Sequence, residues 1–302
     1  MQEHDHTHDH THGVVDATLT TSARGLWAIK WSFIGLAITA LLQSIVVIIS
    51  GSVALLADTI HNFGDAATAL PLGIAFLFSR RKATSRFPYG YGRVEDLAGL
   101  IIILIIFLSA VVAAYQAIDR FFHPQTVSHL GMIIIASLVG FLGNELVAIF
   151  RIKVGKEIKS AALIADGYHA RVDGWTSLAV LFGALGIWFG FPLADPLVGL
   201  GITIAIFFIV WDSVKSVLFR SLDGIEPEII HKIEHVAMGT KGVHSVKSVK
   251  ARWVGHRVYT EIALEVDPKG SFQEIEKITK ELKHQLHHDI SYLEKVVIEL
   301  VS

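Results

Sequence analysis

The sequence predicts an α-helical membrane protein in which six transmembrane helices precede a small cytosolic α+β domain with the element order αββαβ. Three observations carry this prediction. The chain of 302 residues is 52% hydrophobic, with a mean hydropathy of +0.52, which is too apolar for an ordinary soluble protein. Of its 54 charged residues, 24 lie in the last 81 positions. The region before them contains six apolar segments that are long enough to span a bilayer.

Each predicted span has about 20 or more mostly apolar residues, the length that a helix needs to cross the hydrocarbon core. The second and fifth spans contain ionisable residues, so a plain hydropathy window should score them lower than the others. The six spans are Leu26 to Ile49, Val53 to Ser79, Val94 to Phe121, Val127 to Ile152, Ser160 to Phe189 and Leu193 to Leu218.

Lysine and arginine in the loops predict the orientation of the spans, because these residues are retained on the cytoplasmic side. The loops after the second and fourth spans are basic, whereas the other three connections contain no Lys or Arg. We therefore expect both termini in the cytoplasm, in a multi-pass protein of the plasma (inner) membrane. The basic residues are Arg80, Arg81, Lys82, Arg86 and Arg93 in one loop, and Arg151, Lys153, Lys156 and Lys159 in the other.

The C-terminal segment alternates between helix-like and strand-like periodicity. Helices are predicted over Glu226 to Met238 and Phe272 to Leu286. Strands are predicted over Val243 to Arg252, Arg257 to Val266 and Leu293 to Val301, with Gly255 and His256 at the first turn. The expected domains are a His-rich disordered cytosolic tail over 1–24, a transmembrane domain over 25–220 and a cytosolic domain over 221–302.

Composition excludes several functional classes. The net charge of −2 does not indicate a nucleic-acid partner, and the absence of cysteine excludes thiolate metal sites and disulfides. A metal must therefore be held by nitrogen and oxygen ligands. The polar N-terminus has no apolar core of a cleavable signal peptide.

Two stretches 108 residues apart resemble each other. Ala54 to Asp65 and Ala162 to Asp173 are identical at six of twelve positions, and both follow the pattern Asp-x-x-His-x-x-x-Asp. Ionisable groups near the bilayer centre cost about 2.5–3.5 kcal/mol each on insertion scales, so they need partners or a function.

The spacing of the repeat predicts a metal site. His61 and Asp65 share one helix face, and so do His169 and Asp173, because residues four apart lie on the same side of a helix. Both histidines lie about 12–14 Å from opposite faces of the membrane core, near its midplane. Two imidazoles and two carboxylates then form a full tetrahedral set for Zn²⁺. The simpler interpretation is structural hydrogen bonding between helices.

Other polar residues in the spans leave alternatives open. Asp58 and Asp166 either fix the tautomers of the neighbouring histidines or cap or pair locally. Arg171 lies on another side of its helix from His169, and we predict that it pairs with Glu145 of the fourth span. The five alternating histidines of the N-terminal tail are interpreted as a weak metal-capturing segment or a dispensable one. The seven C-terminal histidines are interpreted as solvated, with a cytosolic metal site as the alternative: His231, His235, His244, His256, His284, His287 and His288.

Over nearly its whole length the chain resembles the cation diffusion facilitator family, and zinc-transporting members in particular. The resemblance rests on the six spans, on the His-x-x-x-Asp pair in the second and fifth, on the αββαβ tail, and on the phrases Gly51 to Asp58, Tyr89 to Arg93 and Gly242 to His244. It implies a homodimeric exporter of divalent metal, driven by proton exchange through alternating access, with His61, Asp65, His169 and Asp173 as the transport site.

The resemblance implies Zn²⁺ as the cargo and no organic cofactor. Cadmium, cobalt, iron and manganese are alternative cargoes, and a membrane sensor that binds metal without moving it is an alternative function. A membrane metalloenzyme is not expected, because four protein ligands would close the site and no His-Glu-x-x-His is present.

Overall fold

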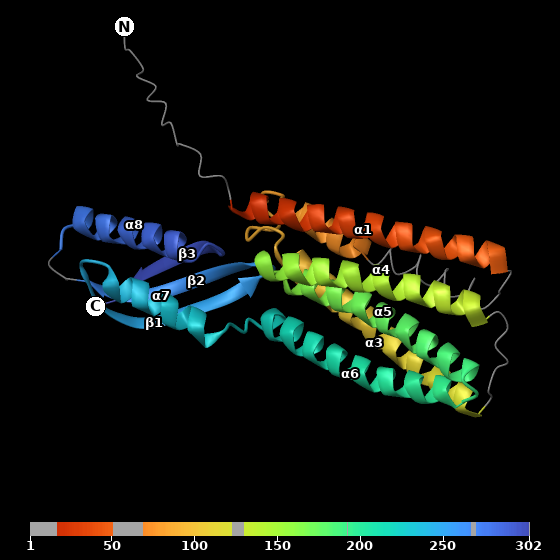
Figure 1. The fold of residues 1–302 in the computed structure, drawn as a ribbon. Coiled ribbons are helices and arrows are strands. Elements are labelled where there is room, and N and C mark those ends of the chain that lie inside the picture. The colour runs from red at the N-terminus through yellow and green to blue at the C-terminus, as the bar shows by residue number, and fades with distance from the viewer. Residues whose placement is uncertain (1–16, 51–68, 123–129, 192, 267–269, 302) are drawn as a thin grey trace, which may run out of the picture.

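The computed structural model describes residues 17–50, 69–122, 130–191, 193–266 and 270–301. Figure 1 shows an elongated molecule in which a bundle of long helices lies at one end and a smaller αβ domain at the other. The chain enters the bundle first and passes to the smaller domain only after α6, in the order that the charge distribution predicts.

Five long helices and one shorter helical segment form the described part of the bundle. They are α1 (Ala17–Ser50), the segment Ala69–Ser79, α3 (Arg93–Phe122), α4 (Leu130–Glu157), α5 (Ala161–Trp188) and α6 (Ala194–Ser221). The closest neighbours are α4 with α5, α3 with α6, α5 with α6 and α1 with α4. The bundle core contains Leu72, Phe76, Ile102, Ile106 and Leu163.

Four stretches of these helices are long and apolar enough to cross a membrane: Thr21–Val46, Arg93–Asp119, Leu130–Glu157 and Pro196–Ser221. They carry large apolar side chains on their outer surfaces, such as Ile45, Leu146 and Phe208, as expected for contact with lipid. Helix α5 is equally long but carries Asp166, Arg171 and Asp173, which lower its hydropathy. The second predicted span lies largely outside the described residues, so the count of six stays a prediction.

Helix α1 begins at Ala17, within the segment predicted to be a disordered tail over 1–24. For residues 17–24 that prediction is wrong. The physical reason is tertiary contact: Thr21 hydrogen-bonds to His256 and Arg257, and Ser22 hydrogen-bonds to Ser79. Residues 1–16, with their five alternating histidines, lie outside the described residues.

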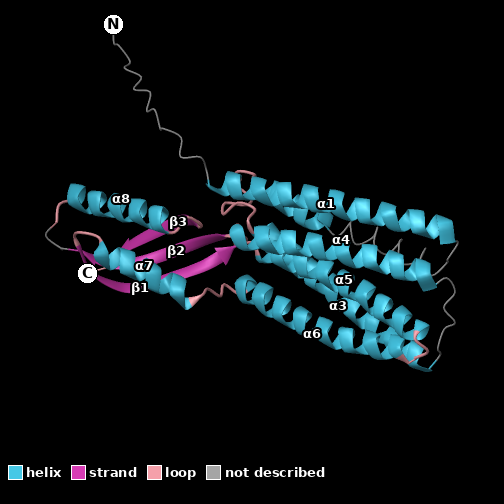
Figure 2. Ribbon diagram, in the orientation of Figure 1, coloured by secondary structure: helices cyan, strands magenta, loops and turns pink. Residues whose placement is uncertain are grey.

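The C-terminal domain confirms the predicted order αββαβ. Its elements are α7 (Pro227–Gly239), β1 (Val243–Val254), β2 (Arg257–Val266), α8 (Phe272–Asp289) and β3 (Leu293–Leu300). Strand β2 lies in the centre of the sheet, antiparallel to β1 and parallel to β3. Figure 2 shows the three strands beside α7 and α8, and Ile233, Trp253, Leu264 and Leu282 fill the core between them.

Candidate metal centre

His169 and Asp173 lie on one face of α5, inside the helix bundle. Their side chains are almost completely buried, at 1% and 4% exposure, and His169 Nε2 lies 3.8 Å from Asp173 Oδ2. The four-residue spacing places them one turn apart. An imidazole and a carboxylate that face the same buried region are ligand types that zinc accepts.

Glycines bring α4 and α5 into close contact on the other side of α5, because Gly167 lies two residues, or more than half a turn, from His169. A Cβ atom on Gly167 would lie 2.6 Å from Ile152 Cγ1 and 3.0 Å from the Ile152 backbone nitrogen. A Cβ on Gly155 would meet the backbone nitrogen of Ile164 at 3.0 Å. Contact at backbone distance is typical of small residues between membrane helices. It keeps lipid away from the side of α5 that faces α4.

Asp166, one turn before His169, pairs with Arg151 of α4. Arg151 Nη1 lies 3.1 Å from Asp166 Oδ2, and both side chains have 0% exposure. Arg151 Nη1 also donates to the backbone carbonyl of Asp166 at 3.4 Å. The sequence left open a role beside His169 or a local cap or pair, and the structure shows a pair with the neighbouring helix α4. Asp58, its counterpart in the repeat, lies outside the described residues.

The predicted pair between Arg171 and Glu145 is confirmed. Arg171 Nη2 donates to Glu145 Oε1 at 2.8 Å, and Arg171 Nε donates to Oε2 at 3.2 Å. Both side chains are a quarter exposed. This two-pronged contact links α5 to α4 on a side of α5 away from His169.

The other half of the predicted site, His61 and Asp65, lies outside the described residues. In the part of the chain that the structure describes, no group of three or more His, Asp or Glu side chains could hold a metal ion. His169 and Asp173 supply only two ligands, so a complete site needs ligands from another segment. The four-residue site therefore stays a prediction.

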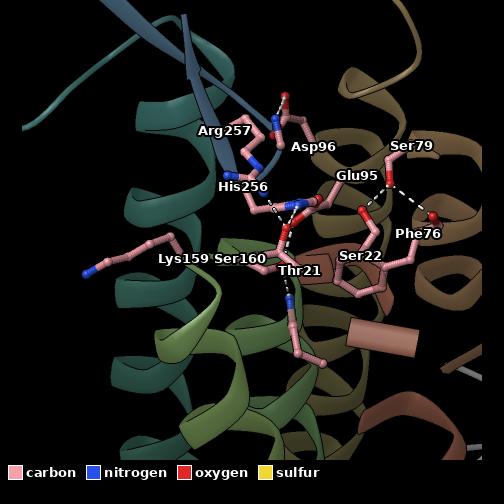
Figure 3. A network of polar contacts seen from close by, with 12 residues as sticks. Thr21, Ser22, Phe76, Ser79, Glu95, Asp96, Lys159, Ser160, His256 and Arg257 are labelled. Carbon is pink, nitrogen blue, oxygen red and sulfur yellow. Dashed lines mark hydrogen bonds and ion pairs between the residues drawn. The ribbon is translucent and has the colours of Figure 1, made fainter. Parts of the chain in front are cut away.

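A second polar cluster, seen in Figure 3, joins the C-terminal domain to the adjacent end of the bundle. His256, in the turn between β1 and β2, is 2% exposed and donates from Nδ1 to Glu95 Oε2 at 2.6 Å. Its Nε2 lies 2.9 Å from Thr21 Oγ1. Glu95 also accepts from Ser160 Oγ at 2.5 Å, and the same Ser160 oxygen caps α5 by accepting from Leu163 N. The cluster connects α1, α3, α5 and the C-terminal domain.

The sequence did not predict this cluster. The interpretation of His256 as a solvated histidine is wrong, because its side chain is buried. The other six C-terminal histidines are exposed, as interpreted. A signal was present: Glu95 and Asp96 are adjacent acids in the first turn of an otherwise apolar helix. Gly255 permits the approach, because its φ is +61° and an added Cβ would lie 2.9 Å from Glu95 Oε2.

Ion pairs beside this cluster also join the C-terminal domain to the bundle. Asp223, just after α6, accepts a hydrogen bond from Arg93 and pairs with Arg252 Nη1 of β1 at 3.5 Å. Partial burial raises the pKa of Asp223, but hydrogen bonds and charge from Arg93 and Arg252 outweigh burial and hold that pKa below its usual range. The carboxylate therefore stays ionised across the physiological pH range.

Comparison with known proteins identifies both halves of the molecule. A family model described as the cation efflux transmembrane domain matches residues 29–220. A second model, described as the cation efflux protein cytoplasmic domain, matches residues 225–300. Among solved structures, a nickel form of the MamM CTD is 19% identical, covering 26% of this chain and 98% of that chain at a TM-score of 0.25.

Two curated relatives match most of the chain. A probable cation efflux system protein of Mycobacterium tuberculosis is 49% identical over 284 residues, covering 94% of this chain and 86% of the relative. A cadmium, cobalt and zinc/H(+)-K(+) antiporter of Bacillus subtilis is 29% identical over 262 residues, covering 85% and 83%. The two model matches and the 49% identity show that the chain belongs to the cation efflux family of multi-pass membrane transporters.

Proposed function

We propose that the protein exports Zn²⁺ from the cytoplasm in exchange for protons, through a site formed by His61, Asp65, His169 and Asp173. The observation that carries the proposal is the placement of His169 and Asp173 on one buried face of α5 within the bundle. The repeat places the same residue pair at His61 and Asp65. Two imidazoles and two carboxylates match the ligand preference and the charge of Zn²⁺.

Proton exchange follows from the chemistry of these ligands. Metal binds to neutral imidazole and ionised carboxylate, so a site loaded with metal must have released its protons. Without metal, Asp65 and Asp173 repel one another, and uptake of protons relieves that repulsion. A site that holds either metal or protons exchanges one for the other when it opens alternately to the two sides. The Bacillus subtilis relative is described as an antiporter.

An orientation with the C-terminal domain in the cytoplasm agrees with export. The basic loop after Ala69–Ser79 lies against the C-terminal domain, where Arg80 and Arg81 line the same cavity as Arg257. The first described turn of α1 also lies beside the C-terminal domain, because Thr21 accepts a hydrogen bond from Arg257. A cytoplasmic placement of this end is consistent with retention of basic loops. We infer that the protein works in the plasma membrane as a homodimer; light scattering of the purified protein in detergent tests the dimer.

Zinc flux into liposomes tests the function. The purified protein is reconstituted, a pH gradient is imposed, and zinc movement is followed for wild type, Asp173→Asn and Asp212→Asn. Asp212 is exposed on α6, so its variant controls for loss of a carboxylate elsewhere in the bundle. We expect gradient-driven flux in wild type and in Asp212→Asn, and loss of at least about tenfold in Asp173→Asn.

Each other outcome decides between the alternatives. Equal flux in wild type and Asp173→Asn would show that the repeat is structural. Flux of manganese or iron without zinc would reject the zinc assignment, since those ions prefer more oxygen ligands. Cadmium and cobalt, which tolerate the same ligands, are tested in parallel. Tight zinc binding without flux of any metal would indicate a sensor.

A further inference from the structure

A basic cavity lies between the bundle and the C-terminal domain. It has a volume of about 230 Å³ and is lined by the loop that follows Ala69–Ser79 and by residues of β1, β2 and β3. A water molecule occupies about 30 Å³ in the liquid, so the cavity has room for a larger group. Because both halves of the molecule line it, a bound group would contact both.

The charge on the cavity wall is strongly positive. Four cationic side chains line it, against one carboxylate, that of Glu294. The cations are Arg80, Arg81, Lys82 and Arg257. Within the residues that the structure describes, the side chains of Arg80 and Lys82 make no ion pair or hydrogen bond. His256, which also lines the cavity, is engaged with Glu95.

Two of the cations are held in position. Arg257 is 3% exposed, and it donates from Nη2 to Thr21 Oγ1 at 2.8 Å and from Nη1 to the Ser291 carbonyl at 3.0 Å. Arg81 stacks on the ring of Phe78, 4.4 Å from its centroid. Figure 3 shows Arg257 beside His256 at this junction. Fixed guanidinium groups lose less conformational entropy when they bind an anion.

The loop that forms the outer wall is ordered by its own contacts. Thr84 and Phe87 exchange two backbone hydrogen bonds of 3.1 Å, and Gly90, at a φ of +79°, closes the next turn. The hydroxyl of Tyr91 lies 3.4 Å from Thr84 Oγ1. The tyrosines Tyr89, Tyr91 and Tyr259 add hydroxyl groups to the cationic lining.

The cavity lies beside the ends of the apolar helical stretches, where we expect the membrane surface. The helical segment ending at Ser79 leads into it, and the apolar stretches of α1 and α3 begin nearby, at Thr21 and Arg93. Phospholipid phosphates are located at this level, and basic pockets on the cytoplasmic side of membrane proteins bind anionic headgroups. Arginine forks and lysine ammonium groups are also the preferred protein donors to phosphate.

We propose that this cavity binds a phosphate group, supplied by the headgroup of an anionic phospholipid. The phosphate bridges the loop cations Arg80, Arg81 and Lys82 to Arg257 of the C-terminal domain. A lipid phosphodiester and free inorganic phosphate both present negatively charged phosphate oxygens to these cations. Only the lipid also carries acyl chains, so the two sources can be distinguished by experiment. The proposal does not depend on the metal that the protein carries.

Ligand-induced thermal stabilisation of the full-length protein in a neutral detergent tests this assignment. The probes are phosphatidylglycerol, phosphatidylcholine and inorganic phosphate. The test variant is Arg80→Gln with Lys82→Gln, and the matched control is Lys153→Gln with Lys156→Gln. All four side chains are exposed. The test variant loses two cations from the loop after Ser79 and the control loses two from the last turns of α4, without disturbing the core.

We expect phosphatidylglycerol, and not phosphatidylcholine, to raise the melting temperature of wild type. The Arg80/Lys82 variant should bind about tenfold more weakly, whereas the Lys153/Lys156 control should bind like wild type. Stabilisation by millimolar inorganic phosphate alone, with the same dependence on the variant, would support the phosphate site with a soluble source. Equal loss in both variants, or no stabilisation of wild type by either anion, would overturn the proposal. Native mass spectrometry counts the bound lipids in the same samples.

Discussion

Two arginine–carboxylate pairs join α4 to α5, and they differ in their exposure. Arg151 of α4 meets Asp166 of α5 with both side chains at 0% exposure. Glu145 of α4 meets Arg171 of α5 with both side chains at 25% exposure. The charges are reversed between the helices, so each helix contributes one cation and one anion.

The difference shows how burial decides what an ion pair does. The exposed pair has two hydrogen bonds, in the two-pronged geometry that suits a guanidinium and a carboxylate. In the buried pair, among the residues that the structure describes, Arg151 Nε and Nη2 have no hydrogen-bond partner. Desolvation of such a pair offsets much of its attraction. The buried pair therefore fixes the relative position of α4 and α5 more than it stabilises the fold.

Removing one member of the buried pair should have the largest effect on stability. Arg151→Met leaves the Asp166 carboxylate buried without its cation, which we expect to cost about 3–5 kcal/mol. Arg151→Met combined with Asp166→Leu removes both charges and should recover most of that loss. Reversible unfolding by denaturant in detergent micelles measures the two free energies. A double variant no more stable than the single one would show that the pair itself stabilises the protein.

An added methyl group at the same helix contact should have an intermediate effect. In Gly167→Ala the new Cβ would lie 2.6 Å from Ile152 Cγ1 and 3.1 Å from Arg151 Cβ. Helices α4 and α5 must then separate at the buried pair, at a cost of about 1–3 kcal/mol. Gly131→Ala is the control, because nothing lies within 4 Å of its added Cβ. If both variants unfold alike, the close helix contact does not contribute to stability.

Loss of the exposed pair should have the smallest effect. Glu145→Gln keeps the shape of the side chain and leaves Arg171 partly exposed, so we expect a loss of about 0.5–1 kcal/mol. Zinc flux in liposomes should stay within about twofold of wild type. Abolished flux at unchanged stability would contradict this expectation and would place Glu145 in the transport pathway.

The sequence was sufficient to predict most of the fold. Periodicity located β2 at its observed bounds, Arg257–Val266, and located α7, α8, β1 and β3 to within three residues at each end. The start of α1 was predicted too late, because polar residues such as Thr21 look like part of a tail. Contacts with residues distant in the sequence, Thr21 with His256 and Arg257 and Ser22 with Ser79, explain why that turn is ordered.

The candidate site was predictable where the spacing of residues along one helix determines the geometry. The shared face of His169 and Asp173 follows from their spacing, and the Glu145–Arg171 pair follows from the rarity of charges in apolar helices. The partner of Asp166 could not be predicted, because Arg151, next to the last residue of the predicted fourth span, was counted among the basic residues of the cytoplasmic loop. The structure places Arg151 inside α4, fully buried.

The contact of Ser160 with Glu95 also has a kinetic consequence. Helix α5 begins at a residue whose hydroxyl is bonded to α3, and the same carboxylate is bonded to His256. Any rocking movement that separates α5 from α3 at this end must first break a buried hydrogen bond to a charged group. Such a bond is worth about 1.5–3 kcal/mol, so that movement becomes slower by about ten- to a hundredfold than it would be without the bond. The first turn of α5 is therefore a point at which the speed of conformational exchange can be set without any change to the metal ligands.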